Sequence, residues 1–218
     1  MGRHPVLDSP ALQTVLTHRL WDYALRRQHA VQAGHETAEL AGVLVQHYGY
    51  GLVEAVRALL GADGEQYSLD GFADKELLAI VFSCNGCPTV RAAEDGLVAL
   101  QEAYAGRVQL LAINSNNPFL SPSDTYGEMV KRAEAKGFNF PYVKDADGSV
   151  AKAFGAARTP HVFLLDAERK LRYRGRIADS RDPAKVTRHD LHVALDDLLA
   201  GRAVEMPETE PSGCAIVW

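Results

Sequence analysis

The sequence predicts an α/β fold in which a central mixed sheet is flanked by helices and preceded by a helical extension. Three observations predict it: apolar runs alternate with helical segments from about residue 64, these runs are short and strand-like, and the first sixty residues show only helical spacing. Apolar runs of this kind are typical of strands covered by helices on both faces. We expect a helical extension over 1–62, a main domain over 63–204 and an extended tail over 205–218.

The first sixty residues are predicted to form three helices. Ser9-Pro10 is a favourable helix start, because a capping residue is followed by proline at the first helical position. The apolar residues that follow fall on one helical face, at Leu12, Val15, Leu16, Leu20, Tyr23 and Ala24. A second helix is expected over 36–48 and a third over 52–60.

The main domain is expected to begin with a polar, turn-rich segment over 66–72. Strands are predicted over 77–83, 108–114, 140–143, 161–165 and 171–174. A helix is predicted after Cys84, to about 105, and further helices over 124–136, 148–154 and 187–199. Glycines follow the last three helices closely, as is common at helix ends. A charged turn joins the last two strands as a hairpin.

Composition limits the classes of function. The chain of 218 residues is 47% apolar and 23% charged, as in ordinary globular proteins. Its formal net charge of −5 gives no reason to expect nucleic acid or an anionic membrane as a partner. Arginines interrupt the apolar residues near the N-terminus, so neither a secretory signal nor a membrane span is predicted there. The expected location is the cytoplasm.

The chemistry of the chain is concentrated in two cysteines separated by two residues, in Cys84-Asn85-Gly86-Cys87-Pro88. They lie between a predicted strand and a predicted helix. A helix N-terminus presents free N–H groups and the positive end of the helix dipole, so it stabilises a thiolate and lowers a cysteine pKa. Two thiols at this spacing can close and open a disulfide. The pair therefore predicts dithiol–disulfide redox chemistry.

Two other interpretations of the cysteines are weaker. Inert core thiols are common, but the position at a strand end, next to Gly86 and Pro88, argues against that role. A zinc site needs a second ligand pair, and Cys214 is a single cysteine, while His189 and His192 are too closely spaced. Five of the eight histidines lie in the first fifty residues without a tight pair on one helical face. No metal and no cofactor is expected.

A second functional element is Arg158-Thr159-Pro160-His161, directly before a predicted strand. A trans proline at a strand start is ordinary. In a strand–helix redox fold, a proline here lies opposite the cysteine helix, and a cis bond turns its backbone toward the sulfurs. An extended substrate or a mixed-disulfide partner can pair with that backbone. Thr159, Pro160 and, beside the cysteines, Pro88 are therefore candidate substrate-binding residues.

These elements resemble the thioredoxin-like proteins of the alkyl hydroperoxide reductase/thiol-specific antioxidant (peroxiredoxin-like) superfamily. The resemblance rests on the segments 81–88, 158–164 and 186–191 in that order. The chain is also similar to a bacterial branch with a Cys-Asn-x-Cys-Pro site and a Gly-Cys-x-Ile-x-Trp C-terminus, matched here by Gly213 to Trp218. The resemblance covers about 64–218. It implies a thioredoxin-like fold, a cis proline at Pro160 and thiol–disulfide or peroxide chemistry.

The leading hypothesis is a thiol–disulfide oxidoreductase, in which Cys84 attacks a protein disulfide and Cys87 resolves the mixed disulfide. The alternative is an antioxidant thiol peroxidase, in which peroxide oxidises Cys87 and Cys84 or Cys214 condenses with it. Cys87-Pro88-Thr89 matches the peroxiredoxin pattern, but Cys84 stands where that family usually has Thr or Ser. A thioredoxin-type or low-molecular-weight thiol is the expected reductant.

Cys214 lies in the extended tail and has three interpretations. It is a tail thiol without a role, a resolving or regulatory thiol, or one end of an intermolecular disulfide, for example in a homodimer. At about 3.3 Å per residue, the tail has the reach to bring it to the Cys84–Cys87 site. A different class of function is a redox-sensing binding module without turnover, in which the N-terminal helices and the proline groove hold a partner.

Overall fold

The computed structural model describes residue 56 and residues 58–218, so most of the predicted N-terminal helices lie outside the described residues. Leu59 and Leu60, expected at the end of the third helix, belong instead to strand β1 (Leu59–Gly61). This strand pairs antiparallel with β2 (Gln66–Tyr67) and with β5 (Tyr142–Lys144). Short apolar runs do not distinguish a helix from a strand, and here the pairing with β5 decides. The sheet therefore begins before the boundary expected at residue 62.

The predicted mixed sheet is confirmed, with the order β2-β1-β5-β4-β3-β7-β8. The central strand β3 (Leu77–Ser83) runs parallel to β4 (Val108–Asn114) and antiparallel to β7 (His161–Leu165). The hairpin between β7 and β8 (Leu171–Gly175) is also confirmed. All seven residues of β3 are buried, which explains why its sequence is continuously apolar rather than alternating.

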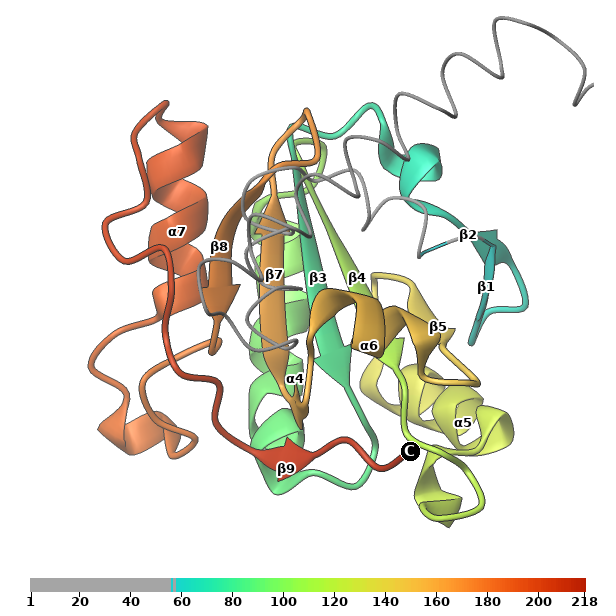
Figure 1. The fold of residues 1–218 in the computed structure, drawn as a ribbon. Coiled ribbons are helices and arrows are strands. Elements are labelled where there is room, and N and C mark those ends of the chain that lie inside the picture. Colours follow the sequence, from blue (N-terminus) through green and yellow to red (C-terminus); the bar gives the residue numbers. More distant parts are fainter. Residues whose placement is uncertain (1–55, 57) are drawn as a thin grey trace, which may run out of the picture. The chain divides into compact units, whose positions relative to one another are not determined.

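Helices cover the sheet on both faces, and successive residues of β3 point to opposite faces. Leu77, Ala79 and Val81 pack with residues of α4 (Pro88–Ala103), α5 (Tyr126–Lys136) and α7 (Asp190–Leu199). Leu78, Ile80 and Phe82 pack with α6 (Ser149–Phe154). Figure 1 shows α6 in front of the sheet and α4 behind it. The three-layer arrangement leaves one edge, at the end of β3, for the site.

Two predicted helices begin later than their sequence suggests. Residues 122–124 form a separate 3₁₀ turn, and α5 starts after Thr125, whose hydroxyl caps the Glu128 N–H. The last helix starts at Asp190 rather than near 187, because the backbone and hydroxyl of Thr187 bind the Asp179 carboxylate instead. Ser, Thr and Asp side chains commonly compete with the helical backbone in this way.

Strand register places the cysteine motif and the proline motif at the same edge. β3 and β4 are paired over their full length, and β7 runs back from this edge with His161 opposite Phe82. Residues after β3 and residues before β7 therefore meet. A second, two-stranded sheet forms there from β6 (Arg158–Thr159) and β9 (Cys214–Ala215), neither of which the sequence predicted. It joins the C-terminal tail to the proline segment.

Candidate redox site

Cys84 and Cys87 lie in the turn between β3 and α4. Cys87 is the N-cap residue of α4, and Pro88 follows at the first helical position. Proline fits there because its missing N–H would have no partner inside the helix anyway. The Val90 backbone in the first turn of α4 lowers the pKa of Cys87, although the Cys87 side chain makes no capping hydrogen bond. The helix start therefore favours the Cys87 thiolate electrostatically, as the motif predicted for one cysteine of the pair.

Thr159 connects both cysteines with the proline segment. Its hydroxyl lies 3.1 Å from the Cys84 Sγ, and its carbonyl oxygen accepts from the Cys87 thiol at 3.1 Å. The peptide bond to Pro160 is cis, which confirms the expectation from the family resemblance. Thr159 is itself buried. Of the residues predicted to bind substrate, Thr159 therefore stands directly against the sulfurs, and Pro160 follows it through the cis bond.

Cys214 reaches the same place from the C-terminal tail. In the β6–β9 pair it lies opposite Thr159, and its thiol is one of the groups that lower the pKa of Cys87. Gly213 makes the approach possible, since a Cβ at this position would lie 2.0 Å from the Thr159 carbonyl oxygen. Its φ of 140° also lies in the region that favours glycine. The structure thus brings all three cysteines of the chain around Thr159.

The environment separates the pKa values of the paired cysteines. A hydrogen bond from Cys84 lowers the pKa of Cys87 to about 4, and the Val90 N–H and the Cys214 thiol act in the same direction against the effect of burial. The pKa of Cys84 is raised, first by that same hydrogen bond, then by burial and by the Asp124 charge. Cys87 has helix N–H donors and Cys84 faces a carboxylate. Cys87 is therefore the thiol of the pair that loses its proton more readily.

A polar network that the sequence did not reveal holds the turn between the cysteines. The buried Asp124 carboxylate accepts the Asn85 N–H at 2.7 Å and the side-chain amides of Asn114 and Asn116, both at 2.9 Å. Burial alone would raise the pKa of Asp124, but hydrogen bonds from Ser121, Asn116 and Asn85 outweigh it and lower the pKa. Asp124 therefore stays ionised beside Cys84.

Asn85 uses its remaining groups in the same network. Its side-chain amide donates to the Ser123 carbonyl at 2.8 Å, and its Oδ1 accepts from the Tyr142 hydroxyl at 3.0 Å. The Asn85 carbonyl accepts from Arg91 of α4 at 2.8 Å. The only sequence signal of this role is that a polar residue stands between the two cysteines. Ser123, in a 3₁₀ turn, and Tyr142, in β5, lie more than thirty residues away in sequence.

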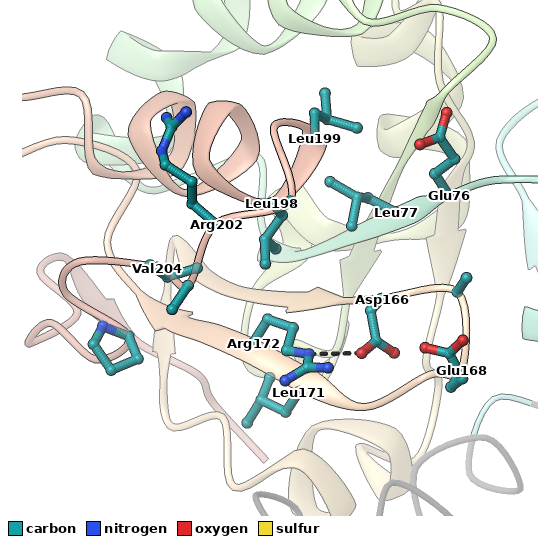
Figure 2. A pocket seen from close by; sticks show the side chains of 14 residues that line it. Glu76, Leu77, Asp166, Glu168, Leu171, Arg172, Leu198, Leu199, Arg202 and Val204 are labelled. Carbon is teal, nitrogen blue, oxygen red and sulfur yellow. Dashed lines mark hydrogen bonds and ion pairs between the residues drawn. The ribbon is translucent and has the colours of Figure 1, made fainter.

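A pocket of about 740 Å³ lies away from the cysteines (Figure 2). It is lined by Glu76 and Leu77 at the beginning of β3, by the β7–β8 turn and by the end of α7. An ion pair of 2.6 Å joins Arg172 and Asp166 across it. The cysteines follow the other end of β3, so the pocket is not part of the redox site. Over residues 58–218, no cluster of side chains fits a metal ion, and no helix is long and apolar enough to cross a membrane.

The geometry defines the class of protein. A Cys-x-x-Cys pair at the start of a helix, after a central strand and against a cis proline, is the arrangement of thioredoxin-like redox proteins. The family model described as Redoxin matches residues 51–192, and the chain therefore belongs to the Redoxin family. It is a redox enzyme with a thioredoxin-like fold.

Two solved structures are similar over most of the chain. An uncharacterized conserved protein from Geobacillus kaustophilus is 37% identical, with a TM-score of 0.70 over 74% of this chain and 87% of that chain. A hypothetical protein from Sinorhizobium meliloti 1021 is 39% identical, with a TM-score of 0.71 over 74% and 90%. A thioredoxin-like protein in the oxidized form, 17% identical with a TM-score of 0.54 over 67% and 98%, has the same fold. No curated protein matches the chain.

Proposed function

We propose that this enzyme is a thiol–disulfide oxidoreductase that cycles the Cys84–Cys87 pair between dithiol and disulfide. The observation that carries the proposal is that both sulfurs contact Thr159 beside the cis proline and that the two cysteines pack in one buried cluster. A thiolate with a second thiol in contact is the minimal apparatus of disulfide exchange. The Redoxin fold supports the same chemistry.

The pKa directions favour an order of attack opposite to the one expected from the sequence. Cys87, not Cys84, has the lowered pKa and is the nucleophile of the proposal. The Cys87 thiolate attacks one sulfur of a disulfide, forms a mixed disulfide and releases the other sulfur as a thiolate. Cys84 then loses its proton to that leaving thiolate, attacks the Cys87 Sγ and expels the second substrate sulfur as a thiolate. The substrate gains two electrons, and the enzyme keeps a Cys84–Cys87 bond.

The proposed substrate is a disulfide presented in extended conformation beside Thr159 and Pro160. A strand at this edge can pair with the Thr159 backbone, as β9 does in the structure. A thioredoxin-type or low-molecular-weight dithiol returns the two electrons. We place the enzyme in the cytoplasm, where reducing thiol pools keep such a pair available for the next cycle.

One observation favours a second candidate, a thiol peroxidase. Cys87 is followed by Pro88-Thr89 and has a lowered pKa, to which the Cys84 and Cys214 thiols both contribute. In this reaction the Cys87 thiolate attacks one peroxide oxygen, the O–O bond breaks and the other oxygen leaves as water or an alcohol. The resulting sulfenic acid then condenses with a second thiol and releases water. Rapid peroxide consumption that Cys87→Ser abolishes and Cys84→Ser tolerates would support the peroxidase over the reductase.

Turnover with defined disulfides tests the reductase proposal. The enzyme, with dithiothreitol as electron donor, is expected to accelerate reduction of insulin disulfides and of glutathione disulfide. Cys87→Ser and Cys84→Ser should each remove this acceleration, because the first lacks the nucleophile and the second lacks the resolving thiol. Arg172→Gln, in the pocket away from the cysteines, is the matched control and should retain the full rate. Full activity in Cys87→Ser would overturn the proposal.

A further inference from the structure

The paired sulfurs are not the accessible sulfurs of this site. Cys84 is 3% exposed and Cys87 is 1% exposed. Cys214, whose thiol helps to lower the pKa of Cys87, is exposed. A partner in solution therefore meets Cys214 before it meets either cysteine of the pair. Exchange rates depend on access to the attacked sulfur as well as on pKa, so this difference in exposure affects the route of the reaction.

The C-terminal strand β9 occupies the place where an extended substrate would pair. Cys214 lies in antiparallel register with Thr159, and Ala215 with Arg158. The Ile216 N–H continues this contact by donating to the Ala157 carbonyl at 2.9 Å. The backbone of the proline segment is thus already paired, and the sulfur presented to Cys87 in this groove is that of Cys214.

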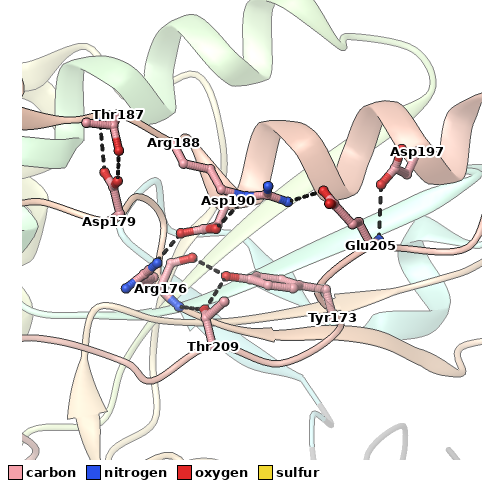
Figure 3. A network of polar contacts seen from close by, with 9 residues as sticks. All are labelled: Tyr173, Arg176, Asp179, Thr187, Arg188, Asp190, Asp197, Glu205 and Thr209. Atoms are coloured by element: carbon pink, nitrogen blue, oxygen red, sulfur yellow. Dashed lines mark hydrogen bonds and ion pairs between the residues drawn. The ribbon is translucent and has the colours of Figure 1, made fainter.

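The tail is fastened before Cys214. Figure 3 shows Thr209 between Tyr173 and Arg176. The Tyr173 hydroxyl lies 2.7 Å from the Thr209 Oγ1, and the Arg176 backbone N–H donates to the same oxygen at 3.1 Å. In the same network, Arg188 bonds to Glu205 at 2.8 Å. These contacts fix residues 205–209 against β8 and the start of α7. They leave only a short stretch of chain before Cys214.

The tail is also fastened after Cys214. Ile216 is buried in the core cluster under α6, and the Val217 N–H donates to the Asn116 Oδ1 at 3.0 Å. The Val217 carbonyl accepts from the Asn117 N–H at 2.8 Å. Lys152 lies 5.1 Å from the centre of the Trp218 ring. Because the chain is anchored before and after Cys214, this cysteine has a defined position in the site and is not a loose tail thiol.

We propose that Cys214 is a third catalytic thiol, which takes up the disulfide of an external partner at the surface and passes it to Cys87. The proposal rests on the dithiol function proposed above and changes its first step: the external disulfide reacts with Cys214, and Cys87 receives the disulfide from Cys214 instead of attacking the partner directly. The partner is a peptide or glutathione-type disulfide, because Cys214 offers an exposed sulfur on an extended strand.

The relay consists of three exchanges that balance. Cys214 attacks one partner sulfur as its thiolate, and its proton passes to the other partner sulfur as that sulfur leaves. Cys87 then attacks the Cys214 Sγ, forms a Cys87–Cys214 bond and expels the second partner sulfur. Cys84 finally attacks the Cys87 Sγ, releases Cys214 as a thiolate and gives its own proton to the expelled partner sulfur. The two electrons that reduce the partner come from the Cys84–Cys87 pair.

Removing the last step should trap the intermediate. The Cys84→Ser variant, treated with glutathione disulfide and digested with trypsin, should yield peptide 76–91 joined to peptide 203–218 through Cys87 and Cys214. A glutathione adduct on Cys87 with Cys214 free would overturn the relay. An adduct that stays on Cys214 while Cys87 remains a thiol would overturn it as well.

A rate measurement separates failure of the relay from failure of the dithiol function. In a glutathione redox buffer, Cys214→Ser should form the Cys84–Cys87 disulfide at least about tenfold more slowly than the wild type, but reach the same final extent, because the pair itself is unchanged. An unchanged rate refutes the relay and leaves the dithiol function standing. A wild type that forms no Cys84–Cys87 disulfide refutes the dithiol function.

A second variant keeps the thiol and changes only its position. Gly213→Val places a side chain where even a Cβ would lie 2.0 Å from the Thr159 carbonyl, so the β6–β9 pairing must open. It should slow the reaction as Cys214→Ser does. Gly201→Ala is the matched control, since this glycine also has a positive φ, of 72°, but nothing lies within 4 Å of the added Cβ. Its relay rate should equal that of the wild type.

Discussion

Single-cysteine variants allow the thiolate to be assigned directly. Replacing Cys84 and Cys214 by Ser leaves Cys87, and replacing Cys87 and Cys214 by Ser leaves Cys84. The hydroxyl groups keep donors beside the Cys87 sulfur, and the Val90 N–H remains. The Asp124 charge, which raises the pKa of Cys84, also remains. We therefore expect the pKa of Cys87 to stay well below 9.0 and the pKa of Cys84 to stay above it.

This difference in pKa gives the two cysteines very different thiolate fractions at neutral pH. A thiol with a pKa of 6 or lower is about 90% thiolate or more at pH 7, whereas one with a pKa of 9 is about 1% thiolate. Titration by the ultraviolet absorbance of the thiolate, with the unfolded variant as reference, measures both values. As pH falls through the pKa of Cys87, its signal should be lost well below the pH at which unfolded protein loses it. If Cys84 titrates below Cys87, the assignment is refuted.

Three further predictions concern pKa and stability. Asp124→Asn should lower the pKa of Cys84, because the Asp124 charge raises it; an unchanged Cys84 titration would contradict this. The same substitution should destabilise the fold by about 2 kcal/mol in denaturant titration, because buried donors lose their carboxylate acceptor. Burial lowers the pKa of His161 from 6.5 to about 4, so stability should be highest above pH 6.5 and fall by about 3 kcal/mol by pH 4, while His161→Phe should flatten this dependence. Phe82→Ala should cost about 4 kcal/mol in the same denaturant assay, since Phe82 is fully buried between Phe154 and Phe163; a loss below about 1 kcal/mol would contradict the packing.

Most of the main domain could be predicted because its signals are local. The apolar run of β3 and the glycine that ends α5 each identify an element without reference to the rest of the chain. The two-residue strands β6 and β9 have no such signal. They exist because segments more than fifty residues apart pair with each other. The β1 strand was missed for the same reason, since pairing with β5 decides its conformation.

The candidate site was predictable in its residue types but not in its electrostatics. Spacing alone marked Cys84, Cys87 and the Thr159-Pro160 step. The order of the two sulfurs depends on which one caps α4 and which one faces Asp124, and those are tertiary facts. The position of Cys214 depends likewise on anchors on both sides of it. The assignment of Cys84 as nucleophile therefore stays a prediction that the environment does not favour.

The most direct test of the redox account is the oxidation state of one tryptic peptide. Wild-type protein is equilibrated in glutathione buffers of graded potential, and its free thiols are then alkylated. After digestion with trypsin, the mass of peptide 76–91, which contains Cys84 and Cys87, is measured by mass spectrometry. The account predicts an unalkylated form of this peptide that is two hydrogens lighter than the dithiol peptide. This form should appear in oxidising buffer and disappear reversibly in reducing buffer. A peptide that is fully alkylated across the whole series, or that carries only glutathione adducts, would contradict the central claim.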